Sequence, residues 1–75
     1  MNIVFLEDER QIKVLVYKPV SELIGIDEKF NSEMQGILFC SRVEYIQGGA
    51  TQFTIDNSTI SRVPQIYEWF YLNCK

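Results

Sequence analysis

The side chains best suited to chemistry are three consecutive acids, Glu7, Asp8 and Glu9. Paired carboxylates can act as general acid and base, or they can bind a hard cation. Neighbouring residues of a strand point to opposite faces, so only Glu7 and Glu9 could converge, whereas a loop would turn all three toward water. We therefore expect a solvated turn rather than a catalytic or metal site. A charged contact with a basic partner is the alternative.

Other routes to catalysis or ligand binding are weakly supported. The chain has no histidine, which removes the commonest general base, the commonest metal ligand and every Ser-His or Cys-His pair. Asp27-Glu28 and Asp56-Asn57-Ser58 lack the spacing of a calcium loop, and Gly48-Gly49 lacks the lysine and following helix of a phosphate-binding loop. We predict a non-enzymatic protein with no cofactor and no metal site.

A cluster of aromatic residues near the C-terminal end is the most informative feature for function. Tyrosine and tryptophan are favoured at protein interfaces, and flat rings can also stack on nucleobases. The alternative is that these rings cover the core of a small domain. If they are exposed, we expect them to bind a partner together with the acidic turn, through Tyr67, Trp69, Phe70, Tyr71, Glu7, Asp8 and Glu9.

Length and charge limit the classes of partner. The 75 residues are expected to form one domain, residues 1–75, with ten acids against seven bases and a formal charge of −3. No two basic residues are adjacent, which disfavours a surface that follows a phosphate backbone, so direct nucleic-acid binding is unlikely. So short a chain has a small core, and this raises the expectation that a homodimer or a foreign protein covers part of the apolar surface.

The cysteines and the hydropathy pattern bear on the cellular compartment. Cys40 and Cys74 are the only cysteines, and two such residues without a secretion signal do not make a disulfide framework. We expect reduced thiols, with Cys40 as a small core or edge residue. No apolar run approaches the roughly 20 residues of a membrane span, so we expect a cytoplasmic protein that does not contact membranes.

The elements that must position these residues begin with a central hairpin within residues 36–63. Apolar residues alternate from Ile37 to Ile46, stop at Gly48-Gly49 and resume up to Ile55, which predicts two antiparallel strands. This pattern places Phe39, Val43, Phe53 and Ile55 in the core. The parity then slips at residues 56–58, which predicts a turn and a further short strand over 59–62.

Two further elements precede the central hairpin. Residues 2–6 are apolar at odd and even positions, and residues 11–17 alternate between apolar and polar. We therefore expect a first hairpin with the acidic residues at its tip. The first strand should be covered on both faces or lie at the edge of a dimer. After Pro19, residues 20–25 allow a single helical turn. Asp27 is placed to begin a helix over residues 28–35, which Gly36 would end.

The last segment, residues 64–74, has two interpretations. A helix that tolerates Pro64 in the first turn would give one apolar face made of Val63, Ile66, Tyr67, Phe70 and Cys74. A strand would instead separate Ile66, Phe70, Leu72 and Cys74 from the other aromatic residues. We favour the helix because proline suits a helix start.

Together these patterns predict an α+β fold, an antiparallel sheet of four or five strands from two hairpins, with one short central helix and a C-terminal helix. A C-terminal strand would give a mostly-β, barrel-like alternative. We expect a small acidic protein-binding module, of the kind that phages and mobile elements use as inhibitors or accessory proteins of host proteins. Two other functions stay open: a nucleotide-like ligand held at a dimer interface, or a small nucleic-acid-binding barrel.

Overall fold

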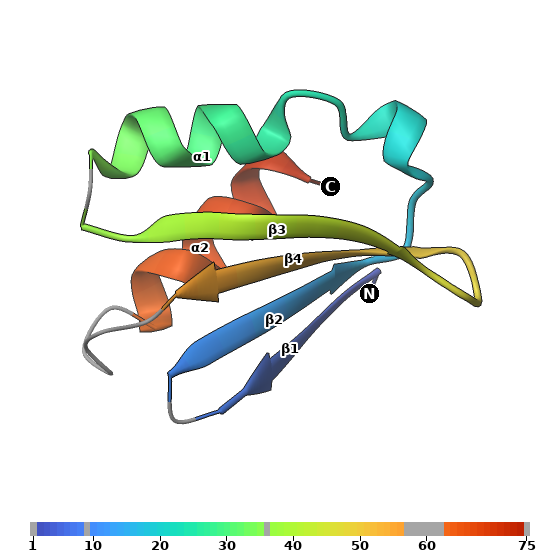
Figure 1. The fold of residues 1–75 in the computed structure, drawn as a ribbon, viewed down its shortest axis with the longest axis horizontal. Helices are drawn as coiled ribbons and strands as arrows, with labels where there is room; N and C mark the ends of the chain where they lie inside the picture. Colours follow the sequence, from blue (N-terminus) through green and yellow to red (C-terminus); the bar gives the residue numbers. More distant parts are fainter. Residues whose placement is uncertain (1, 9, 36, 57–62, 75) are drawn as a thin grey trace.

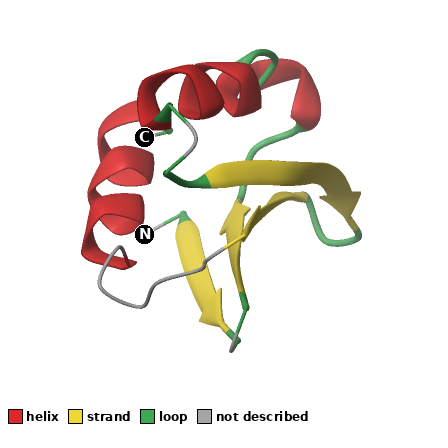
Figure 2. Ribbon diagram, turned by 60° about the vertical axis from the view of Figure 1, so that its left-hand side comes forward, coloured by secondary structure: helices red, strands yellow, loops and turns green. Residues whose placement is uncertain are grey.

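A computed structural model describes residues 2–8, 10–35, 37–56 and 63–74 of the chain. It contains a four-stranded antiparallel sheet with the strand order β1-β2-β4-β3. Two α-helices pack on one side of this sheet, one along β3 and one behind the sheet (Figures 1 and 2). The predicted α+β fold is confirmed.

The N-terminal hairpin consists of β1 (Ile3–Glu7) and β2 (Gln11–Val16), with Glu7 at the end of β1 and Asp8 directly after it. The alternation in β2 turns Ile12, Val14 and Val16 inward, and the three side chains are completely buried. The opposite parity places Lys13 and Leu15 on the other face. This strand therefore has one face in the core and one face outside it.

The connection from β2 to the central helix contains a short 3-10 turn, η1 (Val20–Glu22), as predicted for this segment. The central helix α1 spans Ile26–Met34 and starts earlier than predicted, because Gly25 and not Asp27 precedes the first turn. Gly25 has a φ of 85°, a conformation that glycine adopts at little cost. Asp27 lies instead within the first turn, where the positive end of the helix dipole stabilises its negative charge.

The central hairpin pairs β3 (Phe39–Ile46) with β4 (Ala50–Asp56) around the predicted Gly48-Gly49 loop. The prediction that Phe39 fills the core is wrong. A register shift between Cys40 and Arg42 inverts the parity of the strand at this point. Cys40 consequently points into the core, whereas Phe39 is 53% exposed.

The C-terminal element is the helix α2 (Val63–Asn73), so the strand alternative is wrong. Ile66, Phe70 and Cys74 are buried on the predicted apolar face, and Trp69, which that face omitted, is buried as well. The predicted turn at residues 56–58 and short strand at 59–62 lie outside the described residues, except for Asp56, which ends β4.

The core fills the space between the inner face of the sheet and the two helices. Three fully buried phenylalanines connect the layers: Phe30 of α1 and Phe53 of β4 both contact Phe70 of α2, with ring centroids 5.6 and 5.3 Å apart. Neither α-helix among the described residues is long and apolar enough to cross a membrane. One face of the sheet thus receives all the helical packing that the structure describes.

Candidate functional site

Two of the predicted contact residues, Trp69 and Phe70, lie in the core. Trp69 is 7% exposed and Phe70 is completely buried. The Trp69 indole N–H donates a 2.9 Å hydrogen bond to Oε1 of Glu33, and the indole meets the Phe30 ring in an edge contact at 5.1 Å. In this structure these two rings join α2 to α1 and the sheet, and a partner could not reach them without opening the fold.

The other predicted aromatics meet the acidic turn at one place, which we call the β1–α2 corner: Phe5, Glu7, Tyr67 and Tyr71. The ring centroids of Phe5 and Tyr67 are 4.2 Å apart, and those of Phe5 and Tyr71 are 5.5 Å apart. The Tyr67 hydroxyl donates a 2.5 Å hydrogen bond to Oε1 of Glu7. This bond stabilises the protonated phenol and raises the pKa of Tyr67 to about 12.

Of the two remaining predicted residues, only Asp8 is described, and it directly follows β1. Asp8 is exposed, and the Asp8 backbone N–H donates to the carbonyl oxygen of Gln11 at 2.9 Å. Glu9 lies outside the described residues. The structure therefore brings together Glu7, Tyr67 and Tyr71, and it separates them from Trp69 and Phe70.

The two thiols are buried and unreactive in character. Cys40 is 5% exposed and Cys74 is 1% exposed, and both are free. Loss of hydration on burial raises the pKa of each thiol to about 11, which leaves little thiolate at neutral pH. In the part of the chain that the structure describes, no group of three or more His, Cys, Asp or Glu side chains is arranged to hold a metal.

A surface that the sequence did not single out is the outer face of the sheet, opposite the helices. Three apolar side chains of β1 and β2 lie on this face, with Val4 directly opposite Leu15, and Tyr17 follows β2 and bonds to Asn2 beside β1. Val4, Leu6 and Tyr17 are 39%, 50% and 47% exposed. We call this row the apolar strip: Val4, Leu6, Leu15 and Tyr17.

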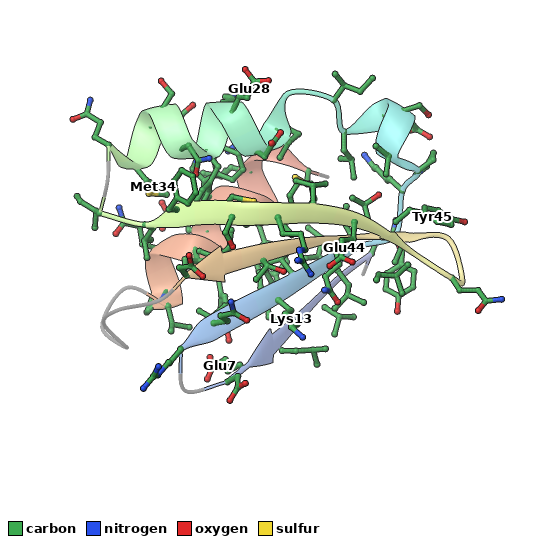
Figure 3. All side chains as sticks on the ribbon, in the orientation of Figure 1. Glu7, Lys13, Glu28, Met34, Glu44 and Tyr45 are labelled. Carbon is green, nitrogen blue, oxygen red and sulfur yellow. The ribbon has the colours of Figure 1, made fainter. Side chains whose placement is uncertain are left out.

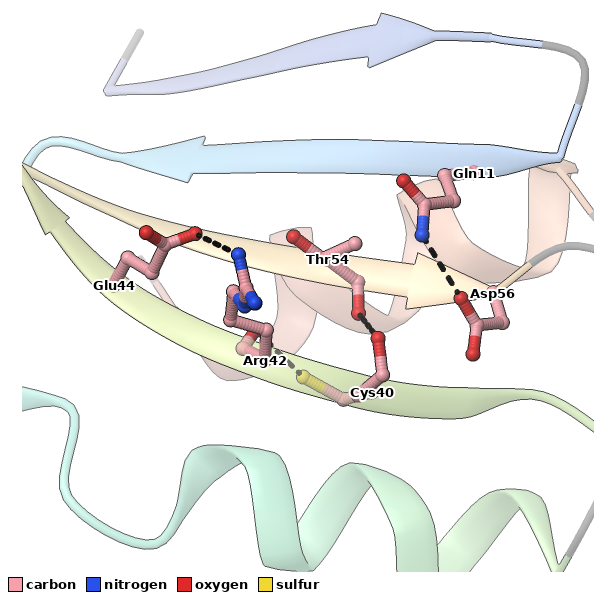
Figure 4. Close-up of polar contacts among 7 residues, drawn as sticks. Gln11, Cys40, Arg42, Glu44, Thr54 and Asp56 are labelled. Carbon is pink, nitrogen blue, oxygen red and sulfur yellow. Dashed lines mark hydrogen bonds and ion pairs between the residues drawn. The ribbon is translucent and has the colours of Figure 1, made fainter.

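Polar side chains cover the other half of the outer face. They line a shallow depression of about 320 Å³, formed by Gln11, Lys13, Ser41, Arg42, Glu44, Gln52 and Thr54. Nη1 of Arg42 lies 3.5 Å from Oε1 of Glu44, and Nε2 of Gln11 donates to Oδ1 of Asp56 at 3.3 Å (Figure 4). Lys13 and Glu44 lie over β2 and β3 on this side (Figure 3). The lining of the depression therefore carries charges of both signs, with two basic side chains and one acidic side chain.

Part of this surface could be anticipated from the alternation in residues 11–17, where Lys13, Leu15 and Tyr17 share the parity opposite to the core. Residues 3–6 are apolar at odd and even positions, which also indicated apolar side chains on both faces of the first strand. The predicted first hairpin places β1 beside β2, but neither pattern shows that the strip faces away from both helices, because that depends on the packing of α1 and α2.

Comparisons of the chain with models of protein families, with curated proteins and with solved structures find no match.

Proposed function

We propose that this chain is a small protein-binding module that contacts a partner protein through the outer face of the sheet. The observation that carries the proposal is the apolar strip beside a polar depression that carries charges of both signs. Protein interfaces commonly combine an apolar centre with polar groups at the rim. Isolated exposed apolar residues need no explanation, but neighbouring ones on a regular surface do.

The charges on the outer face favour a protein over a nucleic acid. Lys13 and Arg42 are the basic residues at the depression, and Glu44 neutralises Arg42 by the ion pair at 3.5 Å. A surface that binds phosphates needs several uncompensated basic groups, because affinity follows the number of neutralised phosphates, whereas the described lining of this depression has only one basic side chain in excess. A protein surface instead requires complementary charges of both signs.

The location of the aromatic residues also supports this choice of surface. Trp69 and Phe70 contribute to the core, so the helix α2 presents fewer aromatic groups than the sequence suggests. The strip, in contrast, belongs to a hairpin that is held by β4 and by the core beneath it. A rigid apolar surface loses little side-chain entropy when a partner covers it, which favours binding.

Substitution of the strip tests the proposal. A tagged chain with Leu6→Lys and Tyr17→Lys is compared with the unchanged chain in capture of proteins from a lysate of the source organism. We expect at least a tenfold loss of captured partner, equivalent to about 1.4 kcal/mol. The matched control is Leu72→Lys on α2, where the replaced leucine is 75% exposed.

Circular dichroism must first show that the variants are folded. The proposal is wrong if the double variant is folded and captures the same proteins at the same level. It is also wrong if Leu72→Lys reduces capture as strongly as the double variant. A narrower role as an inhibitor of a host protein rests on size and acidity alone, and the identity of the captured protein would test it.

A further inference from the structure

The two edge strands, β3 and β1, differ in whether their outward-facing backbone N–H and C=O groups have hydrogen-bond partners. At the β3 edge, the Cys40 N–H donates to Oδ1 of Asn31 at 2.7 Å, and Nδ2 of Asn31 donates to the Cys40 carbonyl at 3.3 Å. A register shift follows directly, and the exposed Arg42 lies beyond it. Side-chain caps, bulges and charges are the devices that prevent an edge strand from pairing with another chain.

The β1 edge has a different backbone pattern. The Tyr17 N–H donates to the Asn2 carbonyl at 2.8 Å, and the Asp8 N–H donates to the Gln11 carbonyl at 2.9 Å. Antiparallel ladders alternate, so the even-numbered residues of β1 bond to β2 and the odd-numbered residues turn their N–H and C=O groups away from it. The outward groups belong to Ile3, Phe5 and Glu7, and no backbone partner for them is found within the described ranges.

Apolar side chains flank this edge on both faces of the sheet. Val4 and Leu6 lie on the outer face, while Phe5 lies on the inner face against Tyr67 and Tyr71. The edge thus offers hydrogen-bonding groups between two apolar layers. Such an edge is suited to pairing with another strand, and it carries no lysine, proline or bulge that would prevent pairing.

We propose that a second copy of this chain pairs with this edge, so that β1 meets β1 of the partner antiparallel and two sheets join into one. The strand is complementary to itself about Phe5. With Phe5 at the two-fold axis, Ile3 faces Glu7 of the partner copy, so every outward residue meets another outward residue. Each of the three residue pairs exchanges two backbone hydrogen bonds.

Apolar side chains also match in this register, except that Glu7 lies opposite Ile3. On the outer face, Val4 lies opposite Leu6 of the second copy, and on the inner face the two Phe5 rings are cross-strand neighbours. The two Glu7 residues are four positions apart along the strand, about 14 Å. That distance exceeds the Debye length of about 8 Å at physiological salt, so the negative charges of the two copies repel weakly.

The helical layer adds area to the contact. Five residues of strand cover only about 17 Å, and a stable dimer needs on the order of 800 Å² per partner. Tyr67 and Tyr71 are half-buried beside Phe5 at the same edge, so two-fold pairing brings the α2 helices of the two copies together as a second layer. We expect this dimerisation to be reversible.

This dimer leaves the outer face of the sheet open and places the two apolar strips next to each other across the axis. Dimerisation does not require that the outer face bind a foreign protein. The two proposals can therefore fail separately, one by molecular mass and the other by partner capture.

The experiment is sedimentation equilibrium of the full chain between about 1 μM and 1 mM. We expect the mass to rise from 8.8 kDa toward twice that value. The informative variant is Glu7→Pro, which removes one outward N–H and leaves the β2-facing groups in place. The matched control is Glu7→Ala, which removes the same carboxylate and keeps the N–H.

Glu7→Pro should weaken dimerisation at least tenfold, and Glu7→Ala should dimerise nearly as well as the unchanged chain. A mass of 8.8 kDa up to 1 mM overturns the proposal, as does a dimer that Glu7→Pro does not weaken. If Glu7→Pro fails to fold, amide exchange in the unchanged chain decides. The Phe5 N–H should become protected only as concentration rises, while the Leu6 N–H should be protected throughout; rapid Phe5 exchange at 1 mM contradicts the proposal.

Discussion

The side-chain amide of Asn31 hydrogen-bonds both backbone groups of Cys40, with the Cys40 N–H at 2.7 Å from Oδ1 and the carbonyl at 3.3 Å from Nδ2. The amide thus provides the donor and the acceptor that a neighbouring strand would provide at the β3 edge. Because Asn31 belongs to α1, the same contact joins the central helix to the sheet. It also accounts for the difference between the two edges.

Replacement of this residue should therefore weaken the fold. In Asn31→Ala, the Cys40 N–H and carbonyl lose their side-chain partners at a residue that is 5% exposed. We expect a loss of about 1 to 3 kcal/mol in the free energy of unfolding, measured by urea denaturation. Ser32→Ala, at an exposed position of the same helix, is the control and should change stability by less than about 0.5 kcal/mol. Equal stability of the two variants would contradict this role of Asn31.

Trp69 is expected to behave as a core residue. Trp69→Ala should lower the free energy of unfolding by about 3 to 5 kcal/mol, enough to unfold much of so small a protein. Glu33→Ala, which removes only the acceptor of the indole N–H, should cost about 1 kcal/mol. Guanidinium denaturation measures both. A Trp69→Ala variant as stable as the unchanged chain would show that the ring lies on the surface.

Stability should decrease in alkaline solution because of the buried thiols. The pKa of Cys40 and of Cys74 is raised from 9.0 to about 11 in the folded chain. The folded state thus holds both protons more tightly than the unfolded state, and the resulting stability is complete below pH 9 and lost as pH rises toward 11. Near pH 10 each thiol contributes a slope of up to about 1.4 kcal/mol per pH unit.

Urea denaturation at pH 7, 9 and 10 measures this slope. Cys74→Ala should be less stable at pH 7 but should lose less stability between pH 9 and 10. The pKa of Tyr67 is raised from 10.0 to about 12. Tyr67→Phe should therefore alter the pH dependence of the free energy of unfolding only above about pH 10. A slope unchanged by Cys74→Ala would show that this thiol is not buried as described.

The start of α1 should depend on the conformation of Gly25. Its φ of 85° is unfavourable for an L-residue, although an added Cβ would meet no atom within 4 Å. Gly25→Ala should cost about 1 kcal/mol from the backbone alone. D-alanine at this position, introduced by chemical synthesis, favours positive φ and should be neutral or stabilising. Equal effects of the two alanines would exclude this cause.

Local patterns in the sequence were sufficient to predict the two hairpins and the C-terminal helix. The alternation of Ile12, Val14 and Val16 has the period of a half-buried strand, and two glycines mark the central loop. These features depend on residues close in sequence, because the period of the apolar residues follows from the backbone geometry of a strand or a helix. The same holds for Pro64, which suits the first turn of a helix.

The features that could not be predicted depend on distant contacts. The register shift after Cys40 exposes Phe39, and nothing in the alternation of the strand marks the position of the shift. Trp69 and Leu72 lie on the same helix, yet the first is 7% exposed and the second 75% exposed. Trp69 lies against α1, where Phe30 provides a ring contact and Glu33 provides the acceptor for the indole N–H.

The outer face of the sheet is the surface that we propose binds a partner protein. The most direct measurement is site-specific photo-crosslinking in the source cells, with benzoylphenylalanine at Lys13, in the centre of that face, and at Leu72 on α2 as the control. Lys13 is chosen because it lies on β2, away from the β1 edge where a second copy would pair. We expect an adduct with a different protein from Lys13 and none from Leu72. Crosslinks from Leu72 but not from Lys13 would contradict it.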